Sequence, residues 1–192
     1  MKLVFASNNK HKIAEIQQLV GEQIEIVSLE DIGCTVDIPE TATTIEGNAI
    51  LKAQYIYENY GLSCFADDTG LEIDALHGEP GVYSARYAGL QRNAEDNMNL
   101  VLANLRNETN RVAQFKTVIA LFFGNETHVF EGIVKGKITF EKKGENGFGY
   151  DPIFQPEEDT RTFAQMTIAE KATMSHRARA LAKLIRFLEQ TT

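Results

Sequence analysis

The chain has 192 residues, of which 43% are hydrophobic and 24% are charged, so it is long enough for a globular domain with a buried core. Its 27 acidic residues outnumber its 19 basic residues and give a formal net charge of −8, which disfavours nucleic acid polymers as partners. Any anion-binding site must therefore be a local cluster of Lys and Arg side chains.

The sequence also argues against a membrane or secreted protein. It has no apolar run near the roughly 20 residues that a bilayer-spanning helix needs, and residues 1–5 turn polar too soon for a signal peptide. Cys34 and Cys64 lack the spacing of a metal or redox motif, which predicts two free, reduced thiols. Because no repeat, low-complexity segment or linker interrupts the chain, we expect a single cytoplasmic domain over residues 1–192.

The first motif joins a strand to a helix. Residues 2–6 have the pattern of a short buried strand, and a helical pattern follows the polar residues 7–12 as far as Gly21. A helix that begins directly after a turn leaves unpaired backbone N–H groups, where its dipole also favours an anion. Lys10 and Lys12 add positive charge there, without a Walker motif. The segment predicts either an anion site or a capped helix with exposed lysines.

A second strand and a longer helix are predicted next. Residues 24–29 have a strand pattern, and a loop then leads to Thr43 and Glu46, which are spaced as a capping box at a helix start. Apolar residues at helical spacing continue from this point until Gly61, which predicts the end of the helix.

Two adjacent carboxylates interrupt the most apolar strand pattern of the chain. An apolar run leads into Asp67 and Asp68, and Gly70 follows, which predicts a strand that ends in a tight turn. Neighbouring residues of a strand point to opposite faces, so one carboxylate faces a cleft and the other faces the packing behind it. Such a pair can hold a divalent cation or position a water. The alternative is a solvated turn, since Asp is common in turns.

The middle of the chain predicts a loop, a helix and a hairpin. Residues 77–87 combine turn formers with aromatic residues and an arginine, which favours an ordered loop near a site. A helix is predicted to start near Asn93. Residues 112–123 and 128–139 then have strand patterns, and the Gly124-Asn125 dipeptide between them predicts a hairpin turn.

Glycines and aromatic residues alternate between residues 144 and 150. Gly147 and Gly149 flank Phe148, and glycine lets a backbone approach a flat ligand closely while a ring stacks on it. The alternative is a glycine-rich turn with Phe148 in the core.

The last predicted helices carry cations. Thr167 and Glu170 are spaced as a second capping box, and the final helix is predicted to begin near Ser175 with His176 and Arg177 in its first turn. Cations at this end of a helix oppose the macrodipole, so we expect an anion or a carbonyl group to pair with them.

Taken together, these stretches resemble the inosine triphosphate pyrophosphatase family, whose members hydrolyse non-standard purine nucleoside triphosphates. The resemblance runs nearly from end to end, and Glu40, which alone is typical of a surface charge, has the family's place ahead of the second motif. Thr69 replaces a common Ser, and Ser7-Asn8-Asn9 replaces a more usual Thr-Gly-Asn, but both changes keep polar donors. The six motifs are Ala6-Ser7-Asn8-Asn9-Lys10 with Lys12, Asn48-Ala49-Ile50-Leu51-Lys52-Ala53, Ala66-Asp67-Asp68-Thr69-Gly70-Leu71, Pro80-Gly81-Val82-Tyr83-Ser84-Ala85-Arg86-Tyr87, Gly147-Phe148-Gly149-Tyr150-Asp151-Pro152 and Ser175-His176-Arg177.

The resemblance implies a fold and a reaction. The fold is α/β, with a long, twisted mixed sheet, flanking helices and two lobes around a central cleft, and the protein is a homodimer. The reaction cleaves between the α- and β-phosphates of the substrate, requires Mg²⁺, and gives a nucleoside monophosphate and pyrophosphate. Mg²⁺ prefers one or two carboxylates together with phosphate oxygens and water, which suits this reaction.

The resemblance also implies roles for single residues. Asp68 is the general base, and Glu40 and Asp68 bind Mg²⁺. The implied triphosphate-binding residues are Ser7, Asn8, Asn9, Lys10, His11, Lys12 and Lys52, and those for the nucleotide and its base are Thr69, Phe148, Gly149, Tyr150, Asp151, Lys171, His176 and Arg177.

Side-chain chemistry predicts part of the specificity. Arg177 carries only hydrogen-bond donors, so it can bind the O6 acceptor of hypoxanthine or xanthine but not the amino group of adenine. Two alternatives stay open at this point. One is a nucleotide pyrophosphatase with another base preference, and the other is a nucleotide sensor without catalysis, which the retained carboxylates Glu40, Asp67 and Asp68 disfavour.

Overall fold

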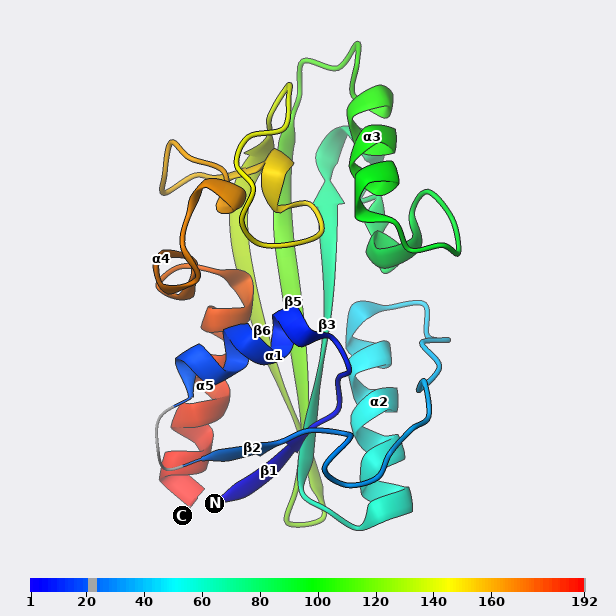
Figure 1. Cartoon of the computed structure of the whole chain (residues 1–192), viewed down its shortest axis with the longest axis vertical. Helices are drawn as coiled ribbons and strands as arrows, with labels where there is room; N and C mark the ends of the chain where they lie inside the picture. The colour runs from blue at the N-terminus through cyan, green and yellow to red at the C-terminus, as the bar shows by residue number, and fades with distance from the viewer. Residues whose placement is uncertain (21–23, 192) are drawn as a thin grey trace. The chain divides into compact units, whose positions relative to one another are not determined.

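A mixed seven-stranded sheet organises the fold (Figure 1). In the computed structural model, which describes residues 1–20 and 24–191, the strands are hydrogen-bonded in the order β2-β1-β3-β5-β6-β7, and β4 pairs with β3. Strand β1 is parallel to β2 and β3, whereas the β3–β4 and β6–β7 pairs are antiparallel. The predicted α/β class, with a mixed sheet and flanking helices, is confirmed.

The elements alternate along much of the chain. The strands are β1 (Lys2–Phe5), β2 (Glu25–Val27), β3 (Cys64–Ile73), β4 (Pro80–Gly81), β5 (Val112–Phe123), β6 (Glu126–Ile138) and β7 (Phe154–Pro156). The α-helices are α1 (Lys10–Leu19), α2 (Ile45–Tyr60), α3 (Ala94–Asn104), α4 (Ile168–Ala172) and α5 (His176–Thr191). Short 3₁₀ helices are η1 (Asp74–Leu76), η2 (Ser84–Arg86), η3 (Asp151–Ile153) and η4 (Phe163–Gln165).

The chain forms two compact units. Unit 1 comprises Met1–Asp68, Thr117–Gly132 and Arg177–Thr192, and unit 2 comprises Thr69–Lys116 and Ile133–His176. The chain therefore passes from one unit to the other within β3, β5 and β6 and after the first residue of α5. The expectation of a single domain with a cleft between two lobes stays a prediction.

In unit 1, helices cover both faces of the strands. The rings of Phe5 on β1 and Phe65 on β3 stack with centroids 4.7 Å apart, and they share an apolar cluster with α1 and α5. Cys64, the neighbour of Phe65, donates from Sγ to the carbonyl of Ala53 on α2 at 3.1 Å. Because neighbouring strand residues face opposite ways, α2 covers the face of β3 that lies away from α1 and α5. Figure 1 shows α2 and α5 on different sides of these strands.

Unit 2 has a core of its own. Residues of β3, α3, β5 and β6 form an apolar cluster together with the segment that contains η3, β7 and η4. The ring of Phe115 on β5 meets Phe154 edge-on, with centroids 4.6 Å apart, and Phe163 packs beside both. This core anchors the loop of residues 144–150, which contains the alternating glycines.

Most predicted helix boundaries are confirmed. Asn93 caps α3, and Thr167 and Glu170 form the capping box of α4. Gly61 ends α2 in the left-handed conformation, with a φ of 63°. Helix α5 begins one residue after Ser175, and the hairpin of β5 and β6 turns at Gly124 and Asn125.

Two helix predictions need correction or lie outside the described residues. Helix α1 ends at Leu19, and the predicted end at Gly21 lies outside the described residues. The capping box of Thr43 and Glu46 was wrong by one position, because Thr44 is the residue in extended conformation whose side chain accepts from Gly47 N–H.

The predicted end of the strand after the two carboxylates was also wrong. Strand β3 continues to Ile73, so Asp67 and Asp68 lie in its middle. Leu71 pairs with Gly81 of β4, and this pairing extends the strand past the local turn signal of Gly70. The carboxylates therefore sit on regular strand backbone, which fixes their directions.

The cysteines and the helices of the described residues bear on two further expectations. Cys34 and Cys64 are free, buried cysteines. None of the helices in residues 1–20 and 24–191 combines the length and the apolar character that crossing a membrane requires.

Candidate active site

Asp67 and Asp68 face different partners. The Asp67 carboxylate accepts from Lys12 Nζ on α1 at 2.9 Å and from Arg177 Nε on α5 at 3.0 Å. The Asp68 carboxylate accepts from Asn48 Nδ2 on α2 at 3.3 Å and lies 3.8 Å from Lys52 Nζ. The alternation along β3 thus separates the two carboxylates, as the sequence predicts. The alternative of a solvated turn is excluded, because both side chains are buried.

Asp67 is a buried charge held by cations. Burial favours its neutral form, but Lys12 and Arg177 outweigh that effect and keep the pKa of Asp67 below its usual value. The pKa of Lys12 is also lowered, because burial outweighs the opposing effect of Asp67. The charged forms of Asp67 and Lys12 therefore depend on the oppositely charged groups around them.

Arg177 continues this network away from the strand. Its side chain is 1% exposed, and its Nη1 donates to the carboxylate of Glu15 on α1 while Nε donates to Asp67. Glu15, Arg177, Asp67 and Lys12 form a chain of alternating charges. The anion predicted for the start of α5 is thus supplied by two carboxylates of the protein. The predicted contact of Arg177 with a purine O6 stays a prediction.

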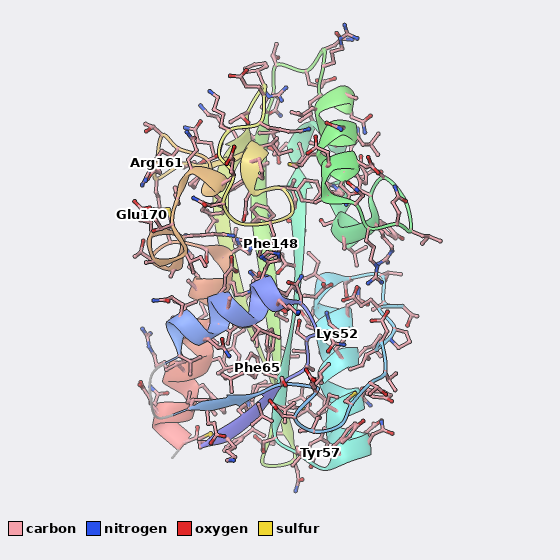
Figure 2. All side chains as sticks on the ribbon, in the orientation of Figure 1. Lys52, Tyr57, Phe65, Phe148, Arg161 and Glu170 are labelled. Atoms are coloured by element: carbon pink, nitrogen blue, oxygen red, sulfur yellow. The ribbon has the colours of Figure 1, made fainter. Side chains whose placement is uncertain are left out.

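Lys52 lies at the centre of a second group of charged side chains. Its Nζ donates to Glu40 Oε1 at 2.6 Å and to the backbone carbonyl of Asp67 at 2.8 Å, and it lies 3.8 Å from Asp68 Oδ1. Figure 2 shows the Lys52 side chain on α2. Burial opposes the charge of Lys52, but Asp68 and Glu40 raise its pKa above the usual value. Burial raises the pKa of Asp68, although Lys52 and Lys12 counteract it.

Glu40 and Asp68 fit the expected Mg²⁺ ligands. Both carboxylates approach one ammonium group, so their oxygens converge on a common point that already favours positive charge. Within residues 1–20 and 24–191, no group of three or more His, Cys, Asp or Glu side chains could hold a metal ion by itself. Mg²⁺ is usually bound by one or two carboxylates together with water and substrate oxygens, and it does not need a site made entirely of protein ligands.

The start of α1 differs from a bare anion site. The side chain of Asn9 caps the helix and accepts from the N–H groups of His11 and Lys12, while Ser7 Oγ accepts from Asn9 N–H. The prediction of unpaired N–H groups was therefore wrong for these three residues, because the turn residues satisfy them. Asn8, Lys10 and His11 are exposed, and Ser7 is half-buried.

Unit 2 contains a second buried ion pair among the predicted site residues. Lys171 Nζ on α4 donates to Asp151 Oδ2 at 2.7 Å, and the same oxygen accepts from Phe148 N–H at 2.9 Å. Lys171 Nζ also lies 5.0 Å from the centre of the Phe148 ring. Gly147 is required here, because its φ is +75° and a Cβ would come within 2.1 Å of Asp151 Oδ2. Phe148 is half-buried, which is intermediate between the ligand-stacking ring and the core ring that the sequence left open as alternatives.

The other predicted residues of unit 2 are His176, Tyr150, Gly149 and Thr69, and the first two are buried. The ring of His176 stacks on Phe115 with centroids 4.6 Å apart, and Tyr150 donates from its hydroxyl to the carbonyl of Ser84 at 2.7 Å. Both side chains belong to buried surroundings. Gly149 has a φ of +63°, and Thr69 is a half-buried residue of β3.

Sequence reasoning missed several residues that hold the site. Glu15 gave no local signal, because its partner Arg177 is distant in sequence, and Asn48 was noticed only as part of a motif. Arg161 forms a bidentate pair with Asp159 through Nε at 3.2 Å and Nη2 at 3.0 Å, and its Nη1 donates to Glu170 Oε1 at 2.8 Å (Figure 2). Since Glu170 precedes Lys171 on α4, this pair ties the preceding loop to the helix that carries Lys171. The Asp-x-Arg spacing was its only sequence signal.

Replacing Arg161 with Ala should change one carboxyl group more than the other. Hydrogen bonds from Arg161 lower the pKa of Asp159 from 3.8 to about 2, whereas the main cause for the pKa of about 2 at Glu170 is the N–H of Thr167. In the variant, we expect the pKa of Asp159 to rise toward 3.8 and that of Glu170 to rise less. Carboxyl-detected NMR titration measures both, and equal shifts would contradict the assignment.

The sheet and its charges define an α/β protein in which buried carboxylates on a central strand pair with cations from the neighbouring helices. The chain belongs to the Ham1 family, whose model matches residues 3–187. It is 62% identical to the dITP/XTP pyrophosphatase of Flavobacterium johnsoniae, over 100% of both chains. The Ham1 protein of Staphylococcus aureus, a solved structure, covers 100% of both chains with a TM-score of 0.91 and 41% identity. A HAM1 protein from Coxiella burnetii has the same TM-score of 0.91, with 38% identity and 99% of both chains covered.

Proposed function

We propose that this protein hydrolyses non-standard purine nucleoside triphosphates, namely ITP, dITP and XTP, to the nucleoside monophosphate and pyrophosphate. The observation that carries the proposal is the identity of 62%, over the full length of both chains, with a protein named dITP/XTP pyrophosphatase. The proposal includes Mg²⁺ as cofactor, a homodimer, and a role in clearing the cytoplasmic nucleotide pool. The cofactor and the dimer both follow from the resemblance to the family, and the metal requirement is tested with chelator and with Glu40→Gln.

In this proposal, the charges of unit 1 bind the triphosphate. Lys12, Lys52 and the residues of the α1 turn contact phosphate oxygens, so that an acidic protein offers a local positive site. Glu40 and Asp68 would hold Mg²⁺, which would neutralise charge on the pyrophosphate leaving group. The bonds of Lys52 to Glu40 and to the carbonyl of Asp67 support this arrangement, because they place a cation beside both carboxylates before substrate arrives.

Asp68 is the proposed general base. It takes a proton from the water that attacks phosphorus, while the bond to the pyrophosphate oxygen breaks and pyrophosphate departs. The bond from Asn48 Nδ2 to Asp68 holds the carboxylate in place, and positioning of this kind contributes to the rate independently of basicity.

Residues of unit 2 are proposed to bind the nucleoside. The half-buried ring of Phe148 offers a stacking surface, and the Asp151–Lys171 pair keeps its loop in one conformation. Discrimination against guanine must act at its 2-amino group, since guanine shares O6 with hypoxanthine. We assign it to the backbone of residues 148–151, which would offer that amine no acceptor or too little room.

The test is a panel of nucleoside triphosphates assayed with Mg²⁺ under one set of conditions. The proposal expects ITP, dITP and XTP to have kcat/KM values well above those of ATP, GTP and the pyrimidine nucleotides. Preference for a pyrimidine or another modified nucleotide would favour the alternative base specificity. Nucleotide binding without turnover of any member of the panel would favour a sensor.

Replacing Glu40 with Gln should raise the Mg²⁺ concentration needed for half-maximal activity. The substitution keeps the size of the side chain but removes one of the two carboxylates that converge on Lys52. Glu46→Gln is the matched control, since Glu46 is exposed in the first turn of α2. Full activity of the wild-type protein in excess chelator would refute the metal requirement, and equal Mg²⁺ curves for both variants would refute the role of Glu40.

A further inference from the structure

Asn48 is a fully buried polar residue that bonds to Asp68 and to the loop that carries Glu40. Its side chain is 0% exposed on α2. Its Nδ2 donates to Asp68 Oδ2 at 3.3 Å, and its Oδ1 accepts from the backbone N–H of Ala42 at 2.9 Å. Ala42 lies two residues after Glu40. One amide group therefore connects the loop that carries Glu40 to the carboxylate of Asp68.

The position of Asn48 on α2 would suit an apolar residue better. Its neighbours on the buried face of the helix include Ala49, Ala53 and Ile56. Asn is a poorer helix former than Ala or Leu, and burial of an amide is costly unless both of its ends are bonded. Here the two ends are bonded, and they bond to two different segments. Packing alone gives no reason for this residue type.

Helix α2 contacts the two oxygens of Asp68 from two successive turns. Asn48 and Lys52 are four residues apart, so they lie on one side of the helix. Asn48 Nδ2 bonds Oδ2, whereas Lys52 Nζ lies 3.8 Å from Oδ1. The amide thus fixes the rotation of the carboxylate, and Oδ1 is directed to the point that Lys52 shares with Glu40.

We propose that Asn48 is a positioning residue that sets the separation and orientation of Glu40 and Asp68 before a metal ion binds. The inference rests on the proposed function, because it assigns these two carboxylates to Mg²⁺. Partners that orient metal ligands in this way usually contribute 10- to 100-fold to metal affinity or activity. Asn48 itself contacts neither the metal nor the substrate in this arrangement.

The test compares Asn48→Leu with Thr44→Ala. Leu has a similar size and favours the helix but makes neither hydrogen bond. Thr44→Ala removes the cap of the same helix, a bond of 3.0 Å to Gly47 N–H, and leaves Asn48 and both carboxylates intact. If Asn48→Leu does not fold, as judged by circular dichroism, Asn48→Ala replaces it.

Two measurements decide the role of Asn48. The first is the affinity for Mn²⁺, followed by electron paramagnetic resonance, with an inosine triphosphate analogue that carries a methylene group between its α- and β-phosphates. The second is the pair of constants kcat and KM for ITP. We expect the Asn48 variant to bind Mn²⁺ about 10- to 100-fold more weakly and to lose kcat with little change in KM. Mn²⁺ affinity and kcat equal to those of Thr44→Ala would overturn the proposal.

Failure of the proposed function would look different. If the wild-type protein releases no pyrophosphate from ITP, the function is wrong, and the Mn²⁺ measurement still decides whether Asn48 organises the two carboxylates. If the wild-type protein is active but the Asn48 variant has the same Mn²⁺ affinity and kcat as Thr44→Ala, the proposed function stands and the positioning role of Asn48 is refuted.

Discussion

Asp68→Asn is expected to lower kcat for ITP by about 10²-fold or more while the protein stays folded. The substitution keeps the shape of the side chain but removes the negative charge that binds the metal and accepts the proton. A loss of this size is the usual lower range when a positioned acid or base is removed. Steady-state kinetics with saturating Mg²⁺ and ITP measures it, together with circular dichroism to verify the fold.

Two companion variants make this result specific. Asp74→Asn is the matched control, since Asp74 follows the end of the same strand and is exposed. Asp67→Asn should weaken nucleotide binding and stability instead, because Asp67 holds Lys12 and Arg177. Near-normal kcat in folded Asp68→Asn would contradict the assignment of the base. An equal loss of kcat alone in Asp67→Asn would contradict the division of roles between the two carboxylates.

Arg177→Ala is expected to lower the free energy of unfolding by about 3–5 kcal/mol, the usual effect of removing one partner from a buried ion pair. The variant leaves the carboxylates of Asp67 and Glu15 without the cation between them, and both are buried. Urea denaturation of the two proteins measures the difference. Arg186→Ala on the exposed side of the same helix is the control and should change stability by less than about 0.5 kcal/mol.

A small effect of Arg177→Ala would show that water or a rearrangement compensates for the lost ion pairs. The folded Arg177→Ala variant, which carries no side-chain donor, then tests the predicted contact with the base. If Arg177 reads O6, the preference for ITP over ATP in kcat/KM shrinks in this variant, while the preference over GTP stays. Unchanged discrimination against ATP means that Arg177 supports Asp67 and does not read the base.

Local patterns in the sequence predicted the elements well where the signal was itself local. The helix caps at Asn93 and Thr167 and the stop at Gly61 depend on a few adjacent residues, and the structure has them. The turn predicted at Gly70 failed because pairing of β3 with β4 outweighs the local preference of one glycine. Strand periodicity was more reliable than the turn signal, since it predicted that Asp67 and Asp68 have different surroundings.

The site was predictable in its charged residues and less so in their partners. Lys12 and the two aspartates were singled out as charges at a helix start or a strand, whereas Lys52 was assigned only through the resemblance to the family. The structure places all four in unit 1. The partner Glu15 could not be predicted, because it lies 162 positions from Arg177 in the sequence. Asn48 was noticed only as part of a motif. Its two hydrogen bonds appear only when the loop, the helix and the strand have folded together.

The identity of the phosphate products tests the central claim most directly. Purified protein with ITP and Mg²⁺ should release inosine monophosphate and pyrophosphate in equal amounts, with no inorganic phosphate, when products are separated by anion-exchange chromatography without added pyrophosphatase. The same experiment with Asp68→Asn controls for contaminating enzymes. Release of inorganic phosphate and inosine diphosphate from the wild-type protein would contradict cleavage between the α- and β-phosphates, and with it the proposed function.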